Sequence, residues 1–243
     1  MRSPQRRGAE AAVRRRIGKL LKTAIALLRD SERLCRALSG RLSEVDAATP
    51  WQRAQARLFA RLADDLRVLE WAAISGYPTQ AMVLGASIHE LGHMAAFIGQ
   101  SDERAQRWLD WKNLDDLPWR PKVIYRGAHE NAFNAPPGES NSLFYKLLCV
   151  AKHGNPAMTA GFEPAVTPDA HVLNLDSDVN PGAHRRVRIA IWMPTRATVI
   201  ALGAMWRPRL LVGPELRLFR SVLQGWDAVD TEVRRWLRRR SAA

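Results

Sequence analysis

Cysteine is scarce in this 243-residue chain, which contains only Cys35 and Cys149. Two cysteines so far apart form neither a disulfide framework nor a zinc knuckle, and their scarcity fits a reducing compartment. The sequence also lacks a GxSxG elbow, a Gly-rich phosphate loop and a GxGxxG motif after a strand. The chain therefore lacks the signatures of α/β-hydrolases, P-loop enzymes and dinucleotide-binding enzymes.

A long uninterrupted hydrophobic run is also missing. The basic stretch 2–16 is not followed by the apolar core and small-residue cleavage site of a secretory signal. The most apolar stretch, 79–100, carries two His and Glu90 near its middle, where ionisable groups would be costly in a bilayer. We therefore expect a soluble, cytoplasmic protein without a stable membrane span. No pattern fixes its oligomeric state.

Acidic residues are outnumbered, 24 against 37 Lys and Arg, which gives a net charge of +13. Such an excess favours RNA or DNA as a partner through long-range attraction, although a set of solvated helix faces has the same composition. A partner protein is the other candidate. The arginines that we predict to contact phosphates lie near the two ends of the chain: Arg14, Arg15, Arg16, Arg235 and Arg239.

Apolar residues recur at three- and four-residue steps through most of the chain, which predicts amphipathic helices. We expect helices over 9–45, 51–74, 81–99, 101–111, 141–153, 186–206 and 214–240. Thr49 is the expected N-cap of the second helix, with Pro50 in its first turn. Residues 117–140 and 157–184 contain several prolines and predict two long irregular connections, the second with at most one short strand near 171–175.

These elements predict one all-α domain over 1–243, a bundle of six or seven helices. The N-terminal helix occupies 1–48, and the remaining core spans 51–240. The stretch 81–99 has two apolar faces, one with Ile88 and Ala95 and the other with His89 and His93, so we expect it to be the central helix.

Residues 89–93 read His-Glu-Leu-Gly-His, the HExxH pattern of zinc metallopeptidases. Histidines four apart share a helix face, so His89 and His93 can bind one zinc ion while Glu90 acts as the general base. The longer HExxHxxGxxH form does not continue, because Ala96 and Gly99 occupy its last two fixed positions. A third ligand would have to come from elsewhere in the chain: Asp110, His129, Glu130 or His153.

The competing interpretation is that both imidazoles belong to the core of the bundle and need no cofactor. The helices before the motif favour it, since zinc peptidases generally set this helix against a sheet. A second candidate site is His153 beside Lys152, where an imidazole at a helix end can meet a phosphate or carboxylate. A C-terminal helix cap explains the same two residues.

The order of these features resembles a family of uncharacterised bacterial helical proteins that is similar in style to HEPN bundles. The matching residues are Glu90, then 101–105 (SDERA) with Trp108, and then Tyr145 and His153, so the resemblance covers about 80–156. It implies an all-helical fold and no settled biochemistry. The candidate catalytic residues remain Glu90, from the HExxH pattern, and His153, from the helix end. Active HEPN ribonucleases carry an Arg shortly before the catalytic His, whereas here Lys146 stands seven residues before His153.

The sequence thus predicts a HEPN-like helical module that contacts nucleic acid or a partner protein, without demonstrable catalytic activity and without a cofactor. The alternative is a zinc-dependent metallohydrolase or metallopeptidase built on His89, Glu90 and His93.

Overall fold

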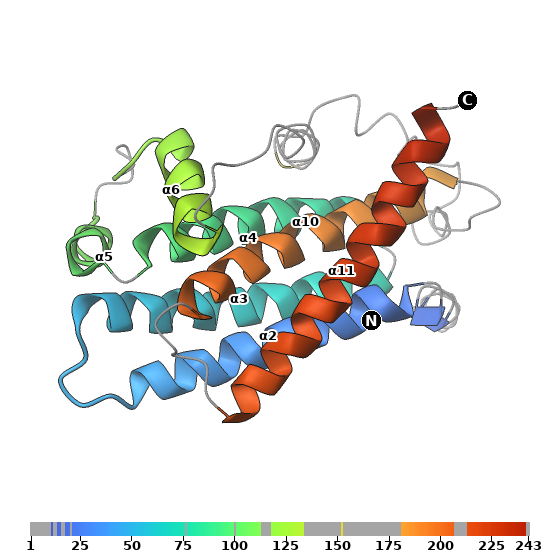
Figure 1. Ribbon diagram of the computed structural model, residues 1–243. Coiled ribbons are helices and arrows are strands. Elements are labelled where there is room, and N and C mark those ends of the chain that lie inside the picture. The colour runs from blue at the N-terminus through green and yellow to red at the C-terminus, as the bar shows by residue number, and fades with distance from the viewer. Residues whose placement is uncertain are drawn as a thin grey trace, which may run out of the picture.

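The computed structural model describes residues 21–75, 77–99, 101–112, 118–133, 181–206 and 213–241, together with residues 11, 14, 15, 18, 19 and 152. Over these residues the protein is an all-α bundle of seven helices with no β-strand (Figure 1). The helices are α2 (Lys22–Ser43), α3 (Pro50–Ile74), α4 (Pro78–Ile98), α5 (Asp102–Leu109), α6 (Pro121–Phe133), α10 (Pro181–Trp206) and α11 (Gly213–Ser241). The predicted all-α fold class is confirmed.

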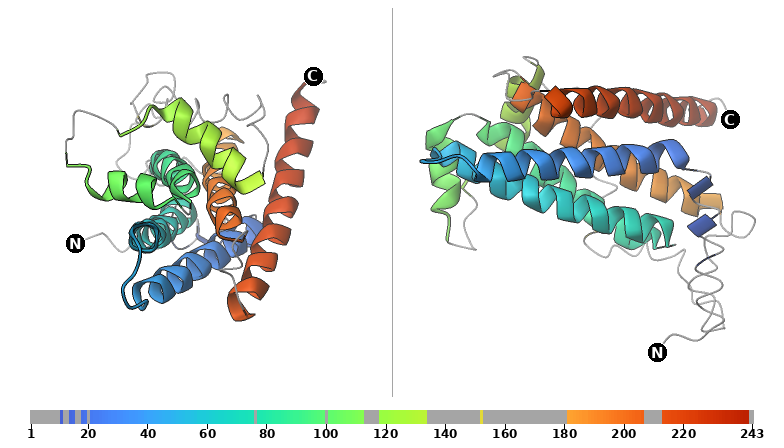
Figure 2. Two further views of the ribbon diagram at one scale, coloured as in Figure 1. Left: turned by 60° about the vertical axis from the view of Figure 1, so that its left-hand side comes forward. Right: turned by 90° about the horizontal axis from the view of Figure 1, so that it is seen from below.

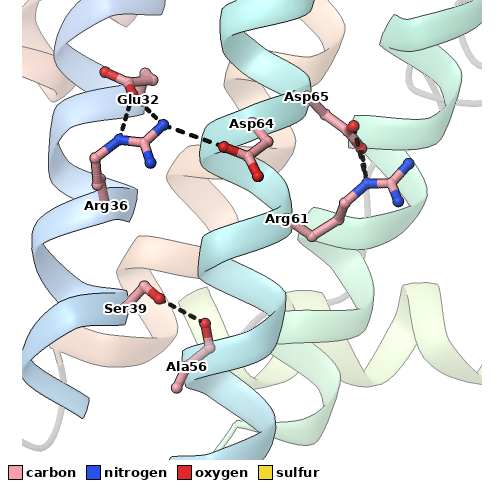
Figure 3. Close-up of polar contacts among 7 residues, drawn as sticks. All are labelled: Glu32, Arg36, Ser39, Ala56, Arg61, Asp64 and Asp65. Carbon is pink, nitrogen blue, oxygen red and sulfur yellow. Dashed lines mark hydrogen bonds and ion pairs between the residues drawn. The ribbon is translucent and has the colours of Figure 1, made fainter. Parts of the chain in front are cut away.

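Helices α2 and α3 form an antiparallel hairpin along one side of the bundle (Figure 1). The turn between them ends at Thr49, whose side chain accepts a hydrogen bond from the Gln52 amide while the Gln52 side chain accepts one from Thr49. With Pro50 in the first turn, this capping box is the predicted start of α3. On the outside of the hairpin Arg36 bridges Glu32 and Asp64, and Ser39 donates to the carbonyl of Ala56 (Figure 3).

Helix α4 is the central helix, as its two apolar faces predict. It packs against α3 on one side and against α10 and α6 on the other. The stretch Thr79–Ile98 is long and apolar enough to cross a membrane, but 67% of it is buried within the bundle. A core helix passes the same test of length and composition, so this property follows from its central position.

Two glycines bring the neighbours of α4 unusually close. A Cβ added at Gly92 would lie 2.6 Å from the backbone oxygen of Ala197 on α10. A Cβ added at Gly127 of α6 would lie 2.6 Å from the ring of Phe97 on α4. Larger residues at these positions would push the helices apart, so glycine sets the separation of α4 from both α10 and α6.

The prediction of an irregular connection over 117–140 is wrong, because Pro121–Phe133 forms α6. Proline is compatible with the first turn of a helix, where its missing N–H needs no partner. The helix is then held by packing, since Ala128 and Ile124 lie against Ala96 and Phe97. A proline that suggested a loop in the sequence therefore marks the beginning of a helix.

Helices α10 and α11 complete the bundle. Helix α10 begins at Pro181, five residues before the predicted start, and continues through Pro194. The Thr195 hydroxyl donates to the carbonyl of Ile191 beside that proline. Helix α11 crosses α2 and α10 (Figure 2).

Two predicted elements lie outside the described residues. One is the helix 141–153, of which only helical Lys152 is described, and the other is the strand near 171–175.

Candidate functional site

The two histidines of the HExxH motif lie inside the bundle, facing α6. His89 is 4% exposed and His93 is 3% exposed. Helix α6 adds Tyr125 and the buried His129, one turn apart, so the four rings form one cluster. The ring centroid of His93 lies 4.2 Å from that of His89, 4.6 Å from that of Tyr125 and 5.6 Å from that of His129. We call these four residues the histidine cluster.

Hydrogen bonding fixes the tautomer of His93. Its Nδ1 lies 2.8 Å from the backbone oxygen of His89. A carbonyl oxygen can only accept, so Nδ1 carries the proton and Nε2 presents a lone pair. That Nε2 is buried and has no hydrogen-bond partner among the described residues. Burial lowers the pKa of His93 well below its usual value, and the nearby charges of His89, His129 and Arg196 lower it further.

His129 is held neutral by the same causes. Burial lowers its pKa to about 4, and the positive charge of Arg196 on α10 contributes. An imidazole with this pKa carries no charge at neutral pH. His93 and His129 are therefore neutral imidazoles in the interior, and the cation of Arg196 opposes the protonation of both.

Glu90 has different surroundings from the two histidines beside it. Its carboxylate forms an ion pair with Lys152, at 2.9 and 3.1 Å from Nζ, and its side chain is 43% exposed. The only acid of the most apolar helix thus lies at the surface with a basic partner. The pair connects α4 to Lys152, the sequence neighbour of His153, which itself lies outside the described residues.

The arrangement around the motif meets part of the requirement for zinc. Of the four predicted third ligands, the fold brings His129 to the pair. Asp110 and Glu130 are exposed and bind Gln106 and Arg126 respectively. In the part of the chain that the structure describes, no three His, Cys, Asp or Glu side chains stand as ligands around one point.

A second candidate site lies on the outer face of the α2–α3 hairpin, at the end where α2 begins and α3 ends. Here a hollow of about 350 Å³ has an apolar floor of Ile25, Ala26 and Ile74. Its rim carries four basic side chains and one acidic one: Arg14, Lys22, Arg29, Arg33 and Asp30. We call this hollow the basic groove.

Charges on the rim of the groove are partly balanced. Arg29 lies 2.7 Å from Glu70, and Arg33 lies 3.5 Å from Asp30. Arg29 and Arg33 nevertheless keep 55% and 67% of their side-chain surface exposed. With exposed Arg14 and Lys22, the rim has more cations than the nearby acids neutralise. By contrast, Arg36 in the middle of the hairpin is shared between Glu32 and Asp64 (Figure 3).

The predicted phosphate-binding arginines come from the two ends of the chain. Arg14 and Arg15 are helical and exposed, and Arg14 lines the groove. Arg235 and Arg239 belong to α11, and Arg16 lies outside the described residues. Lys22, Arg29 and Arg33 were not among the predicted residues. Their spacing in steps of seven and four was the available signal, because such positions share one face of α2.

Comparison with protein-family models, with curated proteins and with solved structures finds no match to this chain. The two sites therefore have to be interpreted from their own geometry.

Proposed function

We propose that this protein binds nucleic acid and that the basic groove is its phosphate-binding site. The observation that carries the proposal is the groove itself, in which four basic side chains surround one hollow on an outer face of the hairpin. Most contacts between proteins and nucleic acids are made to phosphates, by arginine and lysine above all. The net charge of +13 adds a long-range attraction that brings a polyanion to the surface.

The groove has properties that a merely solvated helix face does not share. Three of its cations, Lys22, Arg29 and Arg33, belong to α2, and Arg14 belongs to the helical residues before it; they share the hollow with the apolar residues of the floor. A sugar or base can lie on that floor while the phosphates contact the rim. An acidic protein segment would use the same rim, so the experiment has to separate the two partners.

Salt dependence is the direct test. Affinity for an oligonucleotide should fall linearly on a log–log plot against salt, with a slope of about −3 if all four rim cations contact phosphates of a single strand. Replacing two of them, in Arg14→Gln/Lys22→Gln, should make the slope shallower by about 1.4. Binding that does not change with salt, or that polyglutamate matches at equal charge, would contradict the proposal.

A metal-dependent hydrolase is the second candidate, and one observation favours it. His129 of α6 lies beside the HExxH histidines, and the buried His93 Nε2 has no hydrogen-bond donor among the described residues. A neutral imidazole whose Nδ1 is bound to a carbonyl is a typical zinc ligand. Metal analysis of the purified protein and of His93→Ala tests this candidate. Zinc near one equivalent that the variant loses would support it, and less than about a tenth of an equivalent would rule it out.

A further inference from the structure

Beside the basic groove, the end of α3 presents an exposed aromatic side chain. Trp71 is 44% exposed, and its ring is stacked on that of Tyr77 with centroids 5.7 Å apart and planes 23° apart. Tyr77 is itself partly buried and packs against the core. The indole is therefore held in place from behind while a large part of its surface remains in water.

Trp71 and the groove belong to one continuous surface. Ile74, three residues after Trp71, forms part of the groove floor, and Glu70 holds the rim residue Arg29. Exposed Arg67 lies one turn before Trp71. Residues at these spacings share one face of a helix, and Trp71 and Ile74 are separated by only about 4.5 Å along its axis.

An aromatic platform next to a basic track is the arrangement that binds unpaired bases. Single-strand-binding proteins combine cations that follow the backbone with aromatic rings on which bases stack. The bases of a duplex are already stacked on each other and leave no face for an indole.

From this placement we infer that the protein selects single-stranded over double-stranded nucleic acid, with Trp71 as a base-stacking platform and the basic groove as the adjoining phosphate track. The inference rests on the proposed function and adds the class of ligand to it. Trp71 supplies the preference for unpaired bases, while Arg14 and Lys22 supply affinity that both forms share. Neither role requires the histidine cluster.

The test compares the affinities of oligo(dT), oligo(rU) and a hairpin duplex, each about 15 nucleotides long, for the full-length protein. Trp71→Ala should weaken binding of the single strands about 5- to 100-fold and leave the salt slope and duplex binding unchanged. Trp71→Phe should retain most of the affinity. If Trp71→Ala folds poorly, Trp71→Leu takes its place in the test. Leucine keeps an apolar contact with Tyr77 but lacks the stacking surface, so this variant should show the same loss of single-strand binding. Trp111→Ala, which removes another exposed tryptophan (36%), is the matched control.

The outcomes separate this inference from the function on which it rests. If Trp71→Ala and Trp111→Ala have equal effects while Arg14→Gln/Lys22→Gln weakens binding, the groove binds phosphates and the stacking inference is wrong. If the charge variant has no effect either, the proposed function fails as well. Equal loss of duplex and single-strand binding in Trp71→Ala would also overturn the preference. A difference between oligo(dT) and oligo(rU) identifies DNA or RNA as the better ligand.

Discussion

The histidine cluster and the basic groove contrast in almost every physical respect. The three histidines of the cluster are buried, two of them are held neutral, and the cluster is assembled from α4 and α6. The groove is exposed, carries excess positive charge and is built from α2, the helical residues before it and the end of α3. The cluster contains the most recognisable motif of the sequence, whereas the groove corresponds to no motif. The residue types of this motif also occur in helix cores, so its function can be judged only from its structural surroundings.

Because the two regions differ in burial and charge, we expect them to have different roles. Around α4, close backbone contact and buried imidazole rings favour a role in the stability of the bundle. On the α2–α3 face, charges that remain exposed despite nearby acids contribute little to folding, since exposed ion pairs are worth about 0–1 kcal/mol. Substitutions at α4 should therefore change stability, and substitutions at the groove should change binding.

The largest effect is expected for Gly92→Ala, at the contact between α4 and α10. The added methyl would lie 2.6–2.8 Å from backbone and side-chain atoms of Ala197, so the helices must separate. We expect a loss of about 1–3 kcal/mol in the free energy of unfolding, measured by urea denaturation. Gly40→Ala, at an exposed position of α2, is the matched control, because its new methyl meets nothing within 4 Å. It should stabilise the protein by about 0.5–1 kcal/mol. Equal effects of the two variants would contradict the close packing of α4.

A second effect concerns acid stability. His129 has a pKa of about 4 in the folded protein, against about 6.5 in the unfolded chain, so the unfolded state binds the proton more readily. Its contribution to stability therefore decreases as pH falls from about 6.5 towards 4. At pH 5 the loss from this residue is about 2 kcal/mol relative to neutral pH.

His129→Gln removes this titration and keeps a polar side chain. The difference in unfolding free energy between pH 7 and pH 5 should be about 2 kcal/mol smaller in the variant than in the wild type. Denaturation curves at both pH values measure it. If the two proteins lose equal stability, His129 is not held neutral in the interior.

Much of the fold follows from local sequence, and the candidate sites follow from it only in part. Thr49 and Pro50 predict the start of α3 because a capping box and an N-terminal proline are local signals. Helix α6 was missed because Pro121 has the same local appearance in a loop as in a first helical turn. Packing of Ala128 against Phe97, distant in sequence, decides between them.

The candidate sites likewise depend on contacts between residues that are distant in sequence. Sequence spacing predicts that His89 and His93 share a face, but His129 joins them only because Gly127 lets α6 approach α4. The cations of α2 are visible as one helical face, yet the groove also needs Ile74 from the other helix of the hairpin. Glu90 is an acid in an apolar helix, and its ion pair with Lys152 depends on a contact across 62 residues.

The central claim, that the exposed groove and not the α4 motif binds the partner, is tested most directly by one comparison of affinities. Single-stranded oligonucleotide is titrated at low salt against the wild type, Arg14→Gln/Lys22→Gln and Arg120→Gln/Lys122→Gln. The last variant removes the same charge from exposed positions at the start of α6. We predict that the groove variant binds at least about tenfold more weakly than this control. Equal affinities of the two variants would show that net charge alone attracts the oligonucleotide and would contradict the assignment.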